Sequence, residues 1–273
     1  MITEYDISRY KGAVLNRGSE SINIAPHVLL QPYISCYTVL FPANMPDEAA
    51  ILPSASTRFI FSVTDNCIHS GLCGVNTRAF NAGSYANKMK LMLFVEFHIG
   101  MLFPFLKVEQ HELADSNFSL TDLDKTLAQQ IEAVLLESES IEVLISTLDK
   151  IFLSRMSDFR SQKIIAAMRD KILKYNGNVT QKKITSEFYY SEKHIRRLFL
   201  QYIGTSPKMF SRIVRINHVI HLMKSPARFT DIALQAGFFD QPHLNHDFKI
   251  ICGITPMEYM RNMSVFYNDE FKI

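Results

Sequence analysis

The sequence predicts an α+β protein, with a strand-rich N-terminal domain followed by a wholly helical C-terminal domain. Over residues 1–110 the apolar residues come in short runs that proline, glycine and asparagine interrupt. From Leu120 onwards apolar residues recur every three or four positions, which is the spacing of an amphipathic helix. We therefore expect a sandwich or small barrel over 1–118, a helical connector over 119–160 and an all-helical domain over 161–273.

The strand predictions rest on three apolar runs of the N-terminal half. They cover Ile34–Leu40, Arg58–Val63 and Met92–Phe97. Turn-forming residues such as Pro42, Pro53, Gly71 and Gly74 lie between them. Many short strands at such spacing are typical of a sandwich or barrel.

Two amphipathic stripes predict the helices of the connector. Such stripes either cap the core of the preceding domain or form part of a homodimer interface, and the sequence leaves both alternatives open. The first stripe holds Leu123, Leu127, Ile131, Val134 and Leu135, and the second holds Ile141, Leu144, Ile145, Leu148 and Phe152. A polar boundary follows at Arg155–Gln162.

Composition places the chain among soluble globular proteins. Of its 273 residues, 47% are hydrophobic and 21% are charged, which is enough apolar material for a sizeable core. No apolar stretch reaches the roughly eighteen residues of a membrane span, and the start lacks the basic and apolar regions of a signal peptide. We expect a cytoplasmic protein whose cysteines are reduced, since they lack the paired spacing of a zinc site: Cys36, Cys67, Cys73 and Cys252.

Charge is distributed unevenly between the two halves. Residues 161–273 hold 17 Lys and Arg against 9 Asp and Glu, a net charge of +8. Residues 1–160 hold 12 against 18, a net charge of −6. The asymmetry indicates that the C-terminal half meets a polyanion, although a solvated basic face gives the same count.

The basic half contains an internal repeat with an offset of 49 residues. His194–Phe199 superposes on His243–Phe248, and in each copy a glycine, a proline and an aromatic residue follow. These are Gly204, Pro207 and Phe210 in the first copy and Gly253, Pro256 and Tyr259 in the second. A fixed offset indicates a duplicated unit, and each copy predicts a short helix, a turn and a second helix.

The second helix of each copy has an apolar face and a polar face. Ser191 and Asp240 are the predicted N-caps. The inward stripes are Ile195, Leu198, Phe199 and Tyr202 in the first copy and Leu244, Phe248 and Ile251 in the second. On the outward faces and their flanks we predict DNA contacts from Lys193, His194, Arg196, Arg197 and Gln201, and from Gln241, Pro242, His243, Asn245, His246 and Lys249.

An α-helix fits the major groove of DNA, where arginine can pair with guanine and asparagine or glutamine with adenine. The segment Pro207–Met223 between the copies predicts a helix about 26 Å long. A strut of that length could hold two recognition helices near the roughly 34 Å repeat of DNA, so that both enter successive major grooves.

At these residues the chain resembles the AraC/XylS family of bacterial transcription regulators. The second copy carries the specific part of the match: Asp231-Ile232-Ala233, Gly237-Phe238, Asp240-Gln241, Phe248-Lys249 and Gly253-Ile254-Thr255-Pro256 with Tyr259. The first copy is similar to the family in Ser191, His194, Arg197, Phe199, Gly204 and Ser206-Pro207. The resemblance covers about residues 161–263 and implies two helix-turn-helix units that a long helix bridges.

Several positions depart from the family pattern. Tyr189 stands where the family often has glycine, and Thr185 where it usually has alanine. His246 replaces a common arginine and Pro242 a common serine. The second recognition helix is therefore expected to make fewer charge-assisted contacts than the first.

The N-terminal half is similar to the cupin-like sensor domains attached to this family. The cues are Leu52-Pro53, the strand Phe59–Val63, Gly74 with Thr77, and Phe97 with Gly100. This resemblance implies a domain that binds a small-molecule effector, a partner protein or a second copy of the chain. No effector-binding residue is predicted.

A cupin-like domain raises the alternative of a metal enzyme or carrier with a basic helical appendage. Glu96 and His98 alternate along one predicted strand, with His69 and His111 as further candidates, but no His-x-His pair is present. His243 and His246, which could also bind a metal, occupy predicted DNA-contact positions. Because phosphate-binding loops and nucleophile elbows are also missing from the sequence, we predict no metal, no cofactor and no enzymatic activity.

The sequence therefore predicts a sequence-specific DNA-binding transcription regulator. Double-stranded promoter DNA is the expected partner. RNA polymerase, a small-molecule effector and a second copy of the chain are further candidates. Activation is the expected outcome of binding, and repression remains the alternative.

Overall fold

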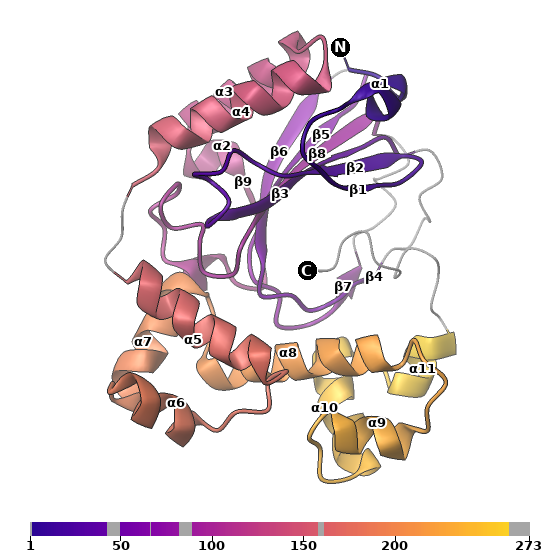
Figure 1. Ribbon diagram of the computed structural model, residues 1–273, viewed down its shortest axis with the longest axis vertical. Coiled ribbons are helices and arrows are strands. Elements are labelled where there is room, and N and C mark those ends of the chain that lie inside the picture. The colour runs from indigo at the N-terminus through magenta and orange to yellow at the C-terminus, as the bar shows by residue number, and fades with distance from the viewer. Residues whose placement is uncertain (1, 43–49, 66, 82–88, 158–160, 262–273) are drawn as a thin grey trace.

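The computed structural model describes residues 2–42, 50–65, 67–81, 89–157 and 161–261 (Figure 1). A sheet-containing N-terminal part and an all-helical C-terminal part follow one another along the chain. The α+β class is therefore confirmed. The predicted boundary at Arg155–Gln162 includes residues 158–160, which lie outside the described residues.

The N-terminal part is built on an antiparallel sheet of seven strands in the order β1-β2-β3-β8-β5-β6-β9. All three predicted strands are found, as the central strands β3, β5 and β8. A second sheet has only two strands, β4 and β7. The strands are β1 (Val14–Arg17), β2 (Ser21–Ile24), β3 (Ile34–Leu40), β4 (Ala50–Ile51), β5 (Thr57–Val63), β6 (Ile68–Cys73), β7 (Phe80–Asn81), β8 (Leu91–Phe97) and β9 (Asn117–Ser119).

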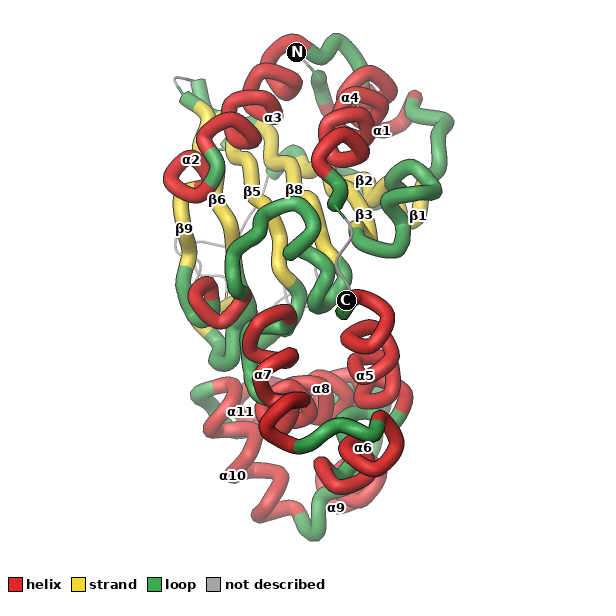
Figure 2. The backbone as a smooth tube through the Cα atoms, turned by 90° about the vertical axis from the view of Figure 1, so that its left-hand side faces the viewer, coloured by secondary structure: helices red, strands yellow, loops and turns green. Residues whose placement is uncertain are grey.

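Helices pack against one face of the seven-stranded sheet. The helical elements of this part are α1 (Glu4–Arg9), the 3₁₀ helix η2 (Gln110–Leu113), α2 (Leu120–Leu123), α3 (Lys125–Glu137) and α4 (Ile141–Arg155). Phe152 of α4 packs against Phe59 and Phe97, with ring centroids 6.4 and 6.2 Å apart. Figure 2 shows α3 and α4 on this side of the strands.

The apolar stripes of the connector lie in the core of the chain itself. Leu127, Ile131 and Leu135 of α3 are buried, as are Leu144 and Leu148 of α4. Both stripes thus cap the sheet, which is one of the two roles that the sequence left open. The exposed apolar residues of these helices are Leu136 and Val143, at 52% and 49%.

The C-terminal part consists of two helical groups at the two ends of α8 (Figure 1). Its helices are α5 (Gln162–Lys174), α6 (Gln181–Phe188), α7 (Glu192–Tyr202), α8 (Pro207–Leu222), α9 (Phe229–Gln235), α10 (Gln241–Cys252) and α11 (Pro256–Arg261). Helix α8 has a proline in its first turn and ends within a residue of the predicted helix Pro207–Met223. The duplicated helix-turn-helix arrangement and its long bridging helix are therefore confirmed.

The N-terminal part contacts the first helical group through apolar residues. The rings of Phe103 and Tyr202 meet edge to face at 5.1 Å, and the guanidinium of Arg169 donates to the Ile99 carbonyl at 3.1 Å. Gly204 has a positive φ of 90°, and a Cβ there would lie 2.8 Å from the Gln110 carbonyl oxygen. Only glycine permits this approach. The buried residues of the N-terminal part and of the first helical group form one continuous core, and those of the second helical group form a separate cluster.

Two loops of the N-terminal part contact the second helical group. The backbone amide of Ala79 donates to the carbonyl of Ile251 in α10 at 3.0 Å. The side-chain amide of Asn217 in α8 donates to the Pro53 carbonyl at 3.3 Å. A β-bridge between Ser54 and Asn76 joins the two loops. The sheet domain therefore contacts both ends of the helical region.

Candidate nucleic-acid interface

The first helix-turn-helix unit consists of α6 and α7. Thr180 caps α6 by accepting from the Lys183 amide, and Ser191 caps α7 by accepting from the His194 amide, each at 3.3 Å. Between the helices the chain turns at Tyr189, which has a left-handed φ of 56°. The predicted cap at Ser191 is confirmed.

The second unit repeats this arrangement with α9 and α10. Gly237 makes the turn with φ of 75°, a conformation that costs glycine little. Asp240 caps α10 by accepting from the His243 amide at 2.8 Å. The cap at Asp240 agrees with the sequence prediction. Helix α9 begins at Phe229, two residues before the Asp231-Ile232-Ala233 segment that carries the family resemblance.

The residues of α7 that were predicted to contact DNA divide into three exposed cations and two half-buried polar groups. Lys193, Arg196 and Arg197 are exposed, whereas His194 and Gln201 are half-buried. The predicted inward stripe of Ile195, Leu198, Phe199 and Tyr202 is buried, so the two faces lie as predicted. This face can offer charged donors to a polyanion.

Helix α10 presents fewer charges. Pro242, His243, His246 and Lys249 are exposed, while Gln241 and Asn245 are half-buried. Lysine is the only permanently charged residue among them. Helix α10 therefore presents fewer permanent charges at these positions than α7 does.

An acidic residue of α10 that the sequence analysis did not single out anchors the helix to α8. Asp247 is buried at 7% exposure and accepts from Arg212 at 2.8 Å and from Arg215 at 3.4 Å. The Arg215 guanidinium also lies over the Phe238 ring, 4.4 Å from its centroid. Burial lowers the pKa of Arg215, an effect that the Asp247 carboxylate opposes. These two cations of α8 are thus paired with a carboxylate of the same unit.

The candidate metal ligands of the N-terminal half do not come together. Strand β8 ends at Phe97, so His98 lies beyond it and its ring contacts the Gln31 carbonyl at 3.1 Å. Glu96 is buried and pairs with Arg58 at 3.3 Å. Within the described ranges no group of three His, Cys, Asp or Glu side chains could hold a metal ion.

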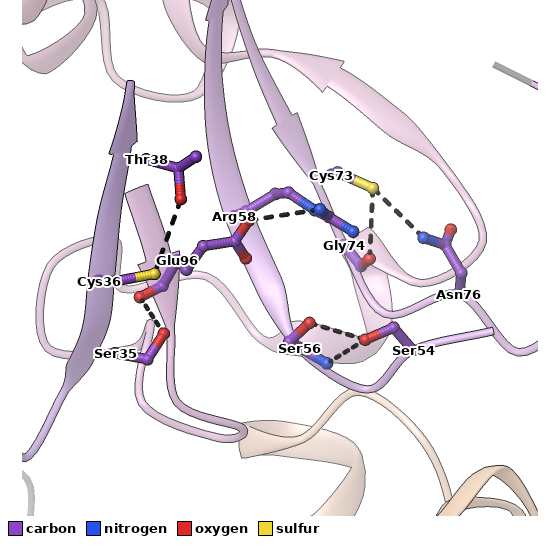
Figure 3. Close-up of polar contacts among 10 residues, drawn as sticks. All are labelled: Ser35, Cys36, Thr38, Ser54, Ser56, Arg58, Cys73, Gly74, Asn76 and Glu96. Carbon is purple, nitrogen blue, oxygen red and sulfur yellow. Dashed lines mark hydrogen bonds and ion pairs between the residues drawn. The ribbon is translucent and has the colours of Figure 1, made fainter. Parts of the chain in front are cut away.

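Glu96 and Arg58 belong to a polar row that crosses four strands (Figure 3). Register places Cys36 opposite Glu96, Glu96 opposite Arg58, and Arg58 opposite Cys73. All four residues are buried. Burial raises the pKa of Glu96, and the Arg58 guanidinium opposes that rise. The side-chain amide of Asn76 donates to the Cys73 sulfur at 3.3 Å. This hydrogen bond connects the polar row to the loop that contacts α10.

Two family profiles match the chain. A helix-turn-helix domain matches residues 184–262, and a domain of unknown function, DUF6597, matches residues 22–119. No helix among the described residues has the length and apolar character to cross a membrane.

Comparison with known proteins finds three that are similar to part or most of this chain. An uncharacterised helix-turn-helix transcriptional regulator, YbfI of Bacillus subtilis, is 33% identical over 70 residues, which is 26% of either chain. Among solved structures, ToxT from Vibrio cholerae has 14% identity and a TM-score of 0.42, covering 82% of this chain and 97% of its own. The C-terminal domain of AraT, a response regulator from Geobacillus stearothermophilus, has 20% identity and a TM-score of 0.36, covering 42% and 95%. From the family profiles, the chain carries an AraC-type helix-turn-helix domain at its C-terminus and a DUF6597 domain at its N-terminus.

Proposed function

We propose that this protein is a sequence-specific DNA-binding transcription regulator. The match of residues 184–262 to a helix-turn-helix domain carries the proposal. It is supported by the net charge of +8 over residues 161–273, which contrasts with −6 over the rest of the chain. Cationic surfaces bind DNA because they release counterions from its phosphates.

Recognition helices α7 and α10 enter successive major grooves in this proposal. Helix α8, with 16 residues, is about 24 Å long and separates the two units. Together with the width of the helices that flank it, this length suits the roughly 34 Å repeat of one DNA turn. The bound protein acts at promoters, and activation through contact with RNA polymerase is the outcome that we propose.

The two recognition helices contribute differently to binding. Arg197 is exposed on the side of α7 opposite its buried stripe, and we assign it a two-bond contact to a guanine. Lys193 lies one turn before it on the same face, and Arg196 flanks it. His246, the outward residue of α10, makes a weaker contact because a neutral imidazole offers one donor and one acceptor. Lys249 lies nearer the helix end and contacts phosphate.

The remaining predicted positions surround these contacts. In α7 the half-buried His194 and Gln201 lie on the flanks of the outward face. In α10 we assign supporting contacts to Gln241, Pro242, His243 and Asn245 at the groove edge.

A salt titration with the full chain tests the proposal. Affinity for duplex DNA should fall as salt rises, with a log–log slope of about −0.9 for each phosphate neutralised. Arg197→Ala should cost roughly 1–3 kcal/mol and relax the preference at one base position. Arg9→Ala, at an exposed arginine of α1, is the matched control. Salt-independent binding, or unchanged affinity and preference in folded Arg197→Ala, contradicts the proposal.

We also propose that the N-terminal domain controls DNA binding, with a small-molecule effector as its signal. This is supported by its contacts with α8 at Asn217 and with α10 at Ile251. Asn217→Ala removes the side-chain contact to Pro53. It should change the DNA affinity of the full chain, and an unchanged affinity would argue against control through this contact.

A homodimer is a further proposal. Since the stripes of α3 and α4 are buried, the apolar residues available to a second copy on these helices are Leu136 and Val143. Leu136→Glu should shift a dimer of the full chain to a monomer in sedimentation velocity. A wild-type chain that sediments as a monomer at micromolar concentration would contradict the proposed dimer.

A further inference from the structure

The turn of the first helix-turn-helix unit contains a tyrosine in a conformation that favours glycine. Tyr189 has φ of 56° and ψ of 30°, and in the turn of the second unit the residue with a positive φ is Gly237. A Cβ in this left-handed region crowds the backbone, so non-glycine residues are disfavoured there. The Tyr189 side chain is 93% exposed. Packing within the chain therefore does not explain why a tyrosine occupies this position.

Ring contacts connect the same turn to the outward face of α7. Tyr190 stacks on His194 with ring centroids 4.6 Å apart and an interplanar angle of 16°. The His194 ring nitrogen Nδ1 in turn contacts the Arg197 guanidinium at 3.4 Å. The left-handed turn is thus continuous with the residues that we assign to the major groove.

The second unit also has an exposed aromatic residue next to one that contacts a histidine ring, but in the opposite order along the chain. Phe239 is 86% exposed and directly precedes Asp240, the cap of α10. Its neighbour Phe238 meets the His243 ring edge-on at 5.3 Å. In both units an exposed aromatic side chain lies just before the recognition helix. A second aromatic ring contacts the histidine whose backbone amide donates to the N-cap side chain.

We propose that Tyr189 and Phe239 are DNA contacts in addition to the recognition helices. The inference rests on the DNA-binding function proposed above. Tyrosine hydroxyls donate hydrogen bonds to phosphate oxygens, and these contacts hold a protein in register on the duplex. Tyr189 donates to a backbone phosphate beside the groove that α7 enters. Phe239 packs its ring on the deoxyribose or thymine methyl beside α10. Backbone strain retained at an exposed residue is typical of functional positions, and this contact accounts for it.

Tyr189→Gly separates the two roles of the residue, because it relieves the left-handed strain while it removes the hydroxyl. Full-length variants are compared on duplexes that the wild type selects from a random pool. We expect Tyr189→Gly to unfold at the wild-type temperature or above it, and yet to bind about tenfold more weakly on all sequences alike. Tyr189→Phe should lose most of the same affinity. Phe239→Ser should also weaken binding, and Tyr5→Ala, at a tyrosine of α1 that is 70% exposed, should not.

The outcomes separate this inference from the function on which it rests. If Tyr189→Gly binds like the wild type while Arg197→Ala is weakened, the turn contact is wrong and the proposed function stands. Wild-type affinity in Tyr189→Phe overturns the phosphate contact. If the wild type selects no duplex at all, both proposals fail.

Discussion

Replacement of Asp247 by alanine should destabilise the second helix-turn-helix unit more than any surface substitution in it. The carboxylate joins α10 to two arginines of α8, at 2.8 and 3.4 Å. Its removal leaves two guanidiniums close together without a counter-charge. The side chains of Arg212 and Arg215 are 20% and 19% exposed, so water can solvate them only in part.

The expected magnitude follows from that burial. Removing one partner of a fully buried ion pair costs about 3–5 kcal/mol. Partial access to water reduces this, and we expect Asp247→Ala to lower the free energy of unfolding by about 2–3 kcal/mol. The unfolding midpoint should then fall by about 4–12 °C, at roughly 2–4 °C for each kcal/mol in a chain of this size.

Thermal and urea unfolding of the full chain measure the effect. Asp231→Ala, at an exposed aspartate of α9, is the matched control and should cost less than about 1 kcal/mol. A double-mutant cycle with Arg212→Ala should show coupling between the two residues. Stability within about 0.5 kcal/mol of the wild type, or strict additivity in the cycle, would refute the anchoring role of Asp247.

Three further predictions concern core packing, acid stability and thiol reactivity. Phe248→Ala should cost about 3–5 kcal/mol and abolish DNA binding by unfolding the unit, as loss of the circular dichroism of the helices would show. Burial raises the pKa of Asp124, but hydrogen bonds from Arg155 and the Leu127 backbone amide lower it by more, so the folded pKa lies below the usual value. The stability that the ionised Asp124 contributes is therefore fully present above the unfolded pKa of about 3.9 and is lost as pH falls through the folded pKa. Asp124→Asn should accordingly show its largest stability loss near neutral pH and little loss in strong acid, and an equal loss at both contradicts this. A thiol reagent should label native protein at the exposed Cys67 alone among Cys36, Cys67, Cys73 and Cys252, because the other three are buried and burial raises the pKa of Cys252 to about 12; fast labelling of a second cysteine in peptide mapping contradicts the burial.

Periodicity and capping chemistry were sufficient to predict the helical half. Ser191 and Asp240 cap the helices that they were predicted to cap, because a short polar side chain before an amphipathic stripe has few other roles. The central strands were predictable for a similar reason, since runs such as Arg58–Val63 are bounded by turn residues.

Contacts between distant segments could not be predicted from these local patterns. From the sequence alone, Asp247 is only an acidic residue three positions after Leu244, which belongs to the inward stripe. Its partners on α8 depend on how two helices cross. The same is true of Arg58 and Glu96, which face each other because β5 and β8 pair in a particular register. The sequence does reveal Tyr189 as a departure from glycine, but only the structure gives its φ of 56° and its exposure.

The most direct test of the central proposal is selection of binding sites by the full chain from a random duplex pool. Two recognition helices at the ends of α8 predict a bipartite motif, with two groups of specified base pairs centred about 10 base pairs apart, one turn of DNA. The group that α7 reads should contain a guanine whose preference Arg197→Ala relaxes. A pool that shows no enrichment, or a single short motif that Arg197→Ala leaves unchanged, would contradict the proposal that this chain reads DNA through both units.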